Sequence, residues 1–214
     1  MKVLVYVEGA SDKQALTGLL DPLIRQKRMQ GVYIQFIDRG SKGDVLSDTL
    51  LQKALRFLQS EPEGQLVVLP DLYPPNKGVV PHETVEELVE GIRDRFHQNA
   101  RDWSVNSREI DDRFHVFCLK YELEALLLAA EEALEDHLDT DTFSVVWTRE
   151  VEDQNHDKPP KEVVREIFRK NGARYEEKVY AHEILEAAVY TEIAERCPQQ
   201  FQPFVDFLSS LGED

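Results

Sequence analysis

The chain has 214 residues, with 25 Lys and Arg against 41 Asp and Glu, which gives a formal net charge of −16. A hydrophobic fraction of 42%, with ten Gly and ten Pro, is typical of a globular protein and excludes a fibrous or low-complexity chain. No apolar run approaches the roughly 18 to 20 residues of a membrane helix, and the N-terminus lacks the layout of a signal peptide. We therefore expect a cytoplasmic protein without membrane contact.

Strands and helices alternate along the first 134 residues. An apolar, β-branched run over residues 2–7 ends at Glu8-Gly9, and helical spacing of apolar residues follows from Leu16 to Ile24. The same patterns predict strands over 32–37, 66–69 and 114–119, and helices over 45–58, 82–99 and 121–134. Such alternation predicts an α/β fold with a mostly parallel sheet covered by helices on both faces.

The alternation fades beyond residue 135. Residues 143–147 fit either an edge strand or a loop plugged by Trp147, and helices are expected over 159–170, 181–196 and 198–211. We divide the chain into an α/β core, residues 1–135, and a mainly helical C-terminal extension, residues 136–214, packed on the same domain.

Acidic residues follow the predicted strands. Glu8, Asp38 and Asp71 end the first three strands, and Glu122 and Glu124 open the helix after the fourth. Ligands of parallel sheets bind beyond the carboxyl ends of the strands, where these side chains should meet. Carboxylates gathered at one edge repel each other unless a divalent cation shares them, and Mg²⁺ suits one or two carboxylates with waters and a phosphate. The pattern therefore predicts a magnesium or manganese site.

Several motifs resemble a known family. They are VEG at the end of the first strand, LVVLPD at the end of the third, KYELEALLLA, DKPPK and YEEKVYAHEIL. Together they resemble an uncharacterised bacterial family with a Toprim-like fold, the fold of topoisomerase and primase domains and of certain ATPase-linked nucleases of phage defence. The resemblance spans most of the chain. It implies that Glu8 acts as a general acid or base and that Asp71 binds Mg²⁺.

One position departs from the Toprim pattern. The usual second Asp of an Asp-x-Asp pair is replaced by Tyr73, whose hydroxyl is a poor Mg²⁺ ligand at neutral pH. Glu122 or Glu124 would supply the missing charge, and because residues two apart on a helix face different directions, we expect only one, Glu122, to face the crevice. The metal ligands are thus assigned to Asp71, Glu122 and Glu124.

Two lysines are candidates for phosphate binding. Lys158 and Lys161 flank two prolines at the start of a predicted helix, and either ammonium group would offset both substrate charge and local repulsion. The alternative is a rigid helix entry and nothing more. Asp12 is expected to be an ordinary helix-start residue, and the loop from Gly40 to Asp44 a turn, because it lacks the spacing of a nucleotide-binding loop.

Two functions of different classes follow. The first is a Toprim-like, metal-dependent phosphodiester-processing protein of the nuclease type, which reaches nucleic acid through the local metal site despite the chain's overall negative charge. The second, which the resemblance implies, is a non-catalytic module that partners an ATPase in bacterial defence or DNA maintenance. An exposed apolar patch at Phe201, Phe204, Phe207 and Leu208 would favour the module, although their helical spacing fits docking onto the chain's own core. A small-molecule phosphatase or nucleotide binder is a third class that the fold permits.

Overall fold

The computed structural model describes residues 1–74, 79–106, 109–140, 150–153 and 158–213. The predicted strand or loop at 143–147 lies outside these residues. No described helix combines the length and the apolar character needed to span a membrane.

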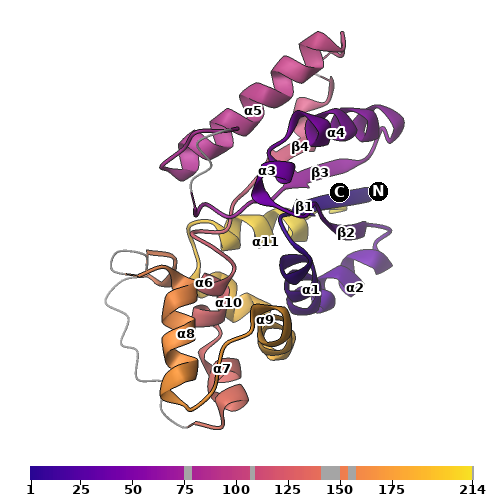
Figure 1. Ribbon diagram of the computed structural model, residues 1–214. Coiled ribbons are helices and arrows are strands. Elements are labelled where there is room, and N and C mark those ends of the chain that lie inside the picture. The colour runs from indigo at the N-terminus through magenta and orange to yellow at the C-terminus, as the bar shows by residue number, and fades with distance from the viewer. Residues whose placement is uncertain (75–78, 107–108, 141–149, 154–157, 214) are drawn as a thin grey trace.

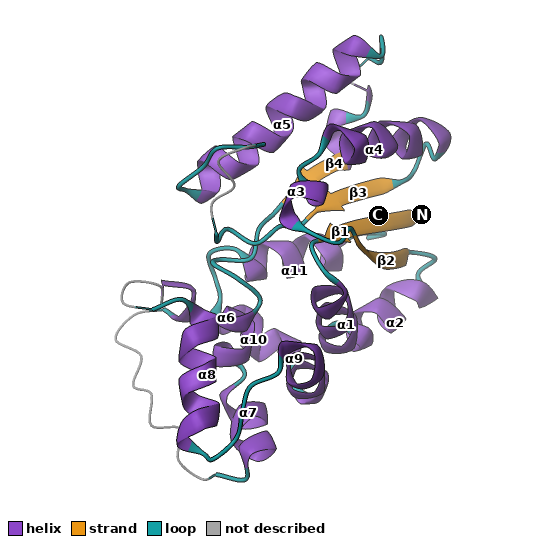
Figure 2. Cartoon of the chain, viewed as in Figure 1, coloured by secondary structure: helices purple, strands orange, loops and turns teal. Residues whose placement is uncertain are grey.

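A four-stranded parallel sheet lies among the helices of the upper part of the molecule, and α6 (Glu124–Ala129), α7 (Glu131–Leu138) and α8 (Pro160–Lys170) lie below it (Figure 2). Its order is β2-β1-β3-β4, with strands β1 (Lys2–Val7), β2 (Tyr33–Asp38), β3 (Gln65–Val68) and β4 (Phe114–Val116). All three strand pairs are parallel. Alternate residues of β1 point to opposite faces, so Val3, Val5 and Val7 enter one apolar cluster while Leu4 and Tyr6 enter the other. The predicted α/β class with a parallel sheet is confirmed.

Helices cover both faces of the sheet (Figure 1). One face carries α3 (Lys42–Val45), α4 (Asp48–Ser60) and α5 (Val85–Asp102). The other carries α1 (Ala10–Leu19), α2 (Asp21–Met29) and α11 (Phe201–Ser210), and α9 (Glu177–Ala187) packs against α1.

After β4 the described chain is helical and returns to the sheet. It contains α6, α7, α8 and α10 (Tyr190–Arg196) in addition to α9 and α11. One-turn 3₁₀ segments lie at Asp111–Arg113, before β4, and at Val151–Asp153. On α11, the Phe204 ring lies 6.5 Å from that of Phe36 and 5.6 Å from that of Phe117. Phe201, Phe204 and Leu208 are buried. The suggestion of an exposed patch there is therefore wrong, because the apolar stripe covers the chain's own sheet.

Three predicted helices are each interrupted. The helix expected through Ile24 breaks at Leu20, where Pro22 opens α2 and cannot extend the hydrogen bonds of α1. The helix predicted over 121–134 begins only at Glu124 and breaks at Ala130, and the one over 181–196 breaks at Ala188 and Val189, which are extended. The apolar spacing in the sequence continues through each break, because the helices before and after the break both pack into the same apolar cluster.

Candidate functional site

Glu8 and Asp71 meet at the carboxyl edge of the sheet. They follow β1 and β3, which are neighbouring strands. The backbone N–H of Asp71 donates to Oε1 of Glu8 at 3.0 Å, so the two residues are in direct contact although 63 positions apart. The structure thus brings together two residues that the sequence placed at the ends of the first and third predicted strands.

Asp12 belongs to the same place. Its Oδ2 accepts a hydrogen bond from the backbone N–H of Gly9 at 2.8 Å and so closes the first turn of α1, as expected of a helix-start residue. Asp12 is also buried, and its charge acts on both Glu8 and Asp71. Sequence reasoning missed this second role, although the spacing of four residues from Glu8 across Gly9 was a usable signal.

Glu122 and Glu124 both face this cluster. Glu122 Oε1 accepts from the backbone N–H of Lys161 at 2.7 Å, and Glu124 Oε1 lies 3.3 Å from Lys161 Nζ and accepts from the Tyr175 hydroxyl at 3.2 Å. Each carboxylate also raises the pKa of Asp71. The expectation that only one would face the crevice is wrong because α6 begins at Glu124, so helical geometry does not separate Glu122 from it.

The two candidate lysines have different surroundings. Lys161 Nζ forms ion pairs with Glu124 and Glu177 inside the cluster, whereas Lys158 pairs with Glu166 on the exposed surface of α8. Burial opposes the charge of Lys161, but Glu124 and Glu177 outweigh it and raise the pKa of the ammonium group. Glu177, on α9, was not singled out from the sequence.

Lys42 is a further residue that sequence reasoning missed. It opens α3 in the loop predicted as a turn, and its buried Nζ donates to the carbonyl oxygens of Asp71 at 2.5 Å, Leu72 at 2.9 Å and Pro74 at 2.9 Å. It therefore fixes the segment that follows β3. Its charge also stabilises the ionised form of Glu8.

Two neighbouring side chains remain outside the cluster. Tyr73 is 38% exposed, so it does not fill the space of the absent second Asp. Asp38, at the end of β2, pairs with Lys13 at 3.3 Å on the surface. Of the acids predicted at the strand ends, Asp38 alone is turned toward solvent in this way.

Burial and mutual repulsion govern the ionisation of this acidic cluster, which we define as Glu8, Asp12, Asp71, Glu122, Glu124 and Glu177. Burial raises the pKa of Glu8 to about 7, that of Asp12 to about 6 and that of Glu124 to about 7, and neighbouring carboxylates add to each shift. Burial, followed by the charges of Glu8 and Asp12, raises the pKa of Asp71 well above its ordinary value. With Lys42 and Lys161 the fully ionised cluster carries 2 − 6 = −4, so near neutral pH it holds protons or attracts cations.

The donor set of the cluster suits a hard divalent cation. Carboxylate oxygens are the ligands of Mg²⁺, which commonly takes one or two from the protein and completes its shell with waters and substrate phosphate. Within the described residues, no three His, Cys, Asp or Glu side chains are already gathered closely enough to bind a metal ion. A cation at Asp71 would thus be held by few protein ligands, which is the coordination that Mg²⁺ accepts.

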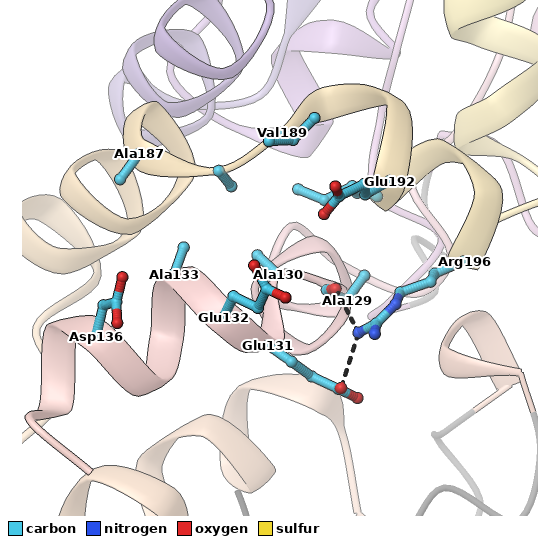
Figure 3. Close-up of a pocket in the computed structure, with 12 residues that line it drawn as sticks. Ala129, Ala130, Glu131, Glu132, Ala133, Asp136, Ala187, Val189, Glu192 and Arg196 are labelled. Carbon is cyan, nitrogen blue, oxygen red and sulfur yellow. Dashed lines mark hydrogen bonds and ion pairs between the residues drawn. The ribbon is translucent and has the colours of Figure 1, made fainter. Parts of the chain in front are cut away.

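A separate pocket lies between α7, α9 and α10 (Figure 3). Its volume is about 130 Å³, below the roughly 300 Å³ of small ligand sites, and alanines line much of it. At its edge, Nη1 of Arg196 donates to the carbonyl oxygen of Ala129 at 3.0 Å and pairs with Glu131 at 2.9 Å. These contacts join α10 to the end of α6, and the pocket contains none of the cluster residues.

Comparisons with known proteins gave two distant structural likenesses and one family match. Among solved structures, the chain is similar to the C-terminal region of the Burkholderia pseudomallei OLD protein, with 15% identity, 98% of each chain covered and a TM-score of 0.48. The C-terminal region of the Xanthomonas campestris pv. campestris OLD protein gives 14% identity, coverage of 98% of this chain and 95% of that chain, and a TM-score of 0.44. No curated protein matches the chain. The model of DUF4276, a domain of unknown function, matches residues 7–209, so the chain belongs to the DUF4276 family, as its resemblance to an uncharacterised family led us to expect.

Proposed function

We propose that the chain is a Toprim-like, Mg²⁺- or Mn²⁺-dependent hydrolase of nucleic acid phosphodiester bonds. The observation that carries this proposal is the convergence of five carboxylates at the carboxyl edge of the sheet: Asp12, Glu122 and Glu124 are buried, and they and the partly buried Glu8 all act on Asp71. Buried like charges are unfavourable by themselves, and a divalent cation with a phosphate is a simple way to compensate them.

Asp71 would hold the cation directly. Glu122 and Glu124, with Asp12, would contact it through coordinated waters, because these carboxylates are not gathered closely enough in the described structure to bind one ion together. When bound, the cation would neutralise charge on the transferring phosphoryl group and lower the pKa of a coordinated water. Lys42 donates to the carbonyl oxygen of Asp71 and so fixes the backbone that carries this carboxylate. The backbone N–H of Asp71 in turn donates to Glu8, which holds the ends of β1 and β3 together.

Glu8 is the group that would move the proton. Its pKa, raised to about 7 by burial, lets the carboxyl group accept or release a proton near neutral pH. Lys161 supplies an ammonium group for a phosphate at the edge of the cluster, where it now neutralises Glu124 and Glu177. Lys158 precedes α8 and pairs with Glu166 on the surface of that helix, so it would contact a phosphate farther from the acidic cluster.

Two observations favour the alternative, a non-catalytic module. Tyr73 stands where the Toprim pattern has a second Asp, and no three ligand side chains of the described residues are gathered closely enough for a metal ion. Against the module, Tyr73 is partly exposed, and the apolar stripe of α11, its candidate docking surface, is buried against the sheet. An ATPase partner and a role in phage defence or DNA maintenance are part of the proposal on the strength of the family resemblance, and both are compatible with a catalytic chain.

The first test is a calorimetric titration of Mn²⁺ and Mg²⁺ into the wild-type chain and into Asp71→Asn, followed by cleavage assays on DNA and RNA with Glu8→Gln included. We expect saturable metal binding that Asp71→Asn abolishes, and cleavage that falls by at least about 100-fold in both variants. Glu132→Gln, an exposed acidic residue of α7, is the matched control and should leave binding and cleavage unchanged.

The outcomes separate the parts of the proposal. No metal binding, with or without an added oligonucleotide, would overturn it altogether. Metal binding at Asp71 without cleavage of any nucleic acid would instead support the non-catalytic module. Cleavage that survives Glu8→Gln would remove Glu8 as the proton carrier.

A further inference from the structure

Positive charge is concentrated in one short segment of this acidic chain. Residues 158–174 contain six Lys and Arg against two Glu, a net charge of +4, whereas the whole chain carries −16. The rest of the protein therefore carries −20, and a polyanion would be repelled from most of its surface. A local cationic face is what phosphate binding requires.

This segment begins at the acidic cluster and leads away from it. Lys161, Arg165 and Arg169 are four residues apart and so lie along one side of α8, the orange helix of Figure 1. Lys161 reaches Glu124, and the charge of Arg165 acts on Glu122. The cationic row is thus continuous with the proposed catalytic cluster.

An open groove follows the same side of the helix. It is lined by Arg165, Arg169, Arg174 and Tyr175, together with Glu162 and Glu166, and has a volume of about 510 Å³. The side chains of Arg165 and Arg169 are 50% and 76% exposed. A planar guanidinium group can contact phosphate through two N–H groups. Tyr175 is buried, and its hydroxyl donates to Glu124, so the groove borders the acidic cluster.

The ion pairs already present on α8 do not prevent this role. Arg165 pairs with Glu162, and Arg169 lies 4.0 Å from Glu166, in both cases on the surface. Exposed ion pairs contribute little to stability, so a phosphate can replace the carboxylate as the partner of either Arg.

We propose that the groove along α8, formed by Arg165, Arg169 and Arg174, binds the phosphodiester backbone of a nucleic acid and leads it to the acidic cluster. This inference rests on the proposed function. Lys161 and Arg169 are eight residues apart, or about 12 Å along the helix, which matches the axial length of roughly three to four phosphates on one strand of a duplex. A mononucleotide would not span that row, so the geometry favours a polymer.

The test measures binding of fluorescently labelled single-stranded and duplex DNA by anisotropy in EDTA, so that no cleavage takes place. Arg165→Gln/Arg169→Gln is compared with Arg25→Gln/Arg28→Gln, a control of equal charge on the exposed side of α2. We expect about tenfold weaker binding or more in the first variant and less than about twofold change in the control. The slope of log K against log salt should fall by about 1.4 for single strands or about 1.8 for duplex, because two phosphate contacts are lost.

Several results would overturn the inference. Equal loss in the two double variants would mean that general charge, and not the α8 groove, attracts DNA. Displacement of DNA by polyglutamate as effectively as by unlabelled DNA would mean that the groove recognises acidic protein. Binding is measured without metal, so it is tested separately from catalysis. Normal DNA affinity of the wild type without cleavage in the presence of metal would contradict the proposed function but not the inference about the α8 groove. Circular dichroism verifies that both double variants are folded.

Discussion

At the residue scale, Asp71 combines burial with repulsion. Its pKa is raised well above the ordinary value, first by burial and then by Glu8, Asp12, Glu124 and Glu122. A carboxyl group whose pKa is higher in the folded state contributes stability below its unfolded pKa and loses that contribution as the pH rises through its folded pKa. For Glu8 and Glu124 this loss extends from about pH 4 to beyond pH 7. The metal-free cluster therefore destabilises the fold at alkaline pH.

Replacing Asp71 with Asn should relieve this repulsion. In EDTA at pH 8, we expect Asp71→Asn to be more stable than the wild type, because the neutral amide removes a buried charge beside Glu8 and Asp12, and the gain should shrink toward pH 5. Urea denaturation at both pH values measures it, with the exposed Asp136→Asn as control. A variant that is less stable than the wild type at pH 8 would show that Asp71 is compensated by contacts of its own.

At the element scale, α11 depends on a carboxylate from a distant segment. Glu152 is 1% exposed and accepts from the backbone N–H groups of Gln199 at 2.6 Å, Gln200 at 3.0 Å and Phe201 at 3.1 Å. These are the unpaired donors at the start of α11, where negative charge is also favoured by the helix dipole. The contact holds the start of the helix whose aromatic side chains cover the sheet.

Removing this carboxylate should loosen α11. We expect Glu152→Ala to lower the free energy of unfolding by about 2–3 kcal/mol, because buried N–H groups lose a charged acceptor. Glu152→Gln retains one acceptor oxygen and should lose clearly less. The readouts are urea denaturation and hydrogen exchange at the amide of Phe201, and equal losses in the two variants would argue against a hydrogen-bonding role.

At the scale of the whole molecule, the two parts of the chain share one core. The larger apolar cluster contains β1 and α1 from the first part, and α9 and α11 from the second. We therefore propose that residues 1–135 and 136–214 belong to one folding unit.

A single cooperative transition should follow from this shared core. Near- and far-ultraviolet circular dichroism should report the same midpoint in urea. Leu55→Ala on α4 and Leu208→Ala on α11 remove matched, fully buried side chains from the two parts. Each should lower the free energy of unfolding by about 2–5 kcal/mol while keeping one transition. Two separate transitions in Leu208→Ala would contradict the single unit.

The sequence alone predicted the parts of this protein that depend on local pattern. Short β-branched runs between amphipathic helices established the parallel sheet, and the carboxyl ends of adjacent parallel strands necessarily share an edge. That rule places Glu8 and Asp71 at the same edge, and the strand order of the structure, with β1 beside β3, brings them into contact. The docking of α11 was equally readable from its apolar spacing.

Only the tertiary structure decided the rest of the site. Lys42 contacts carbonyl groups 29 to 32 positions away, and Glu177 reaches Lys161 from α9, so neither has a local signal that distinguishes it from a surface residue. Asp12 caps its own helix, and that local role gives no sign that burial also places it beside Asp71. The helix breaks at Leu20 and Ala130 could not be predicted from the sequence pattern. Apolar periodicity shows which side of a helix is buried, whereas the position at which one helix ends and the next begins depends on the elements that each helix packs against.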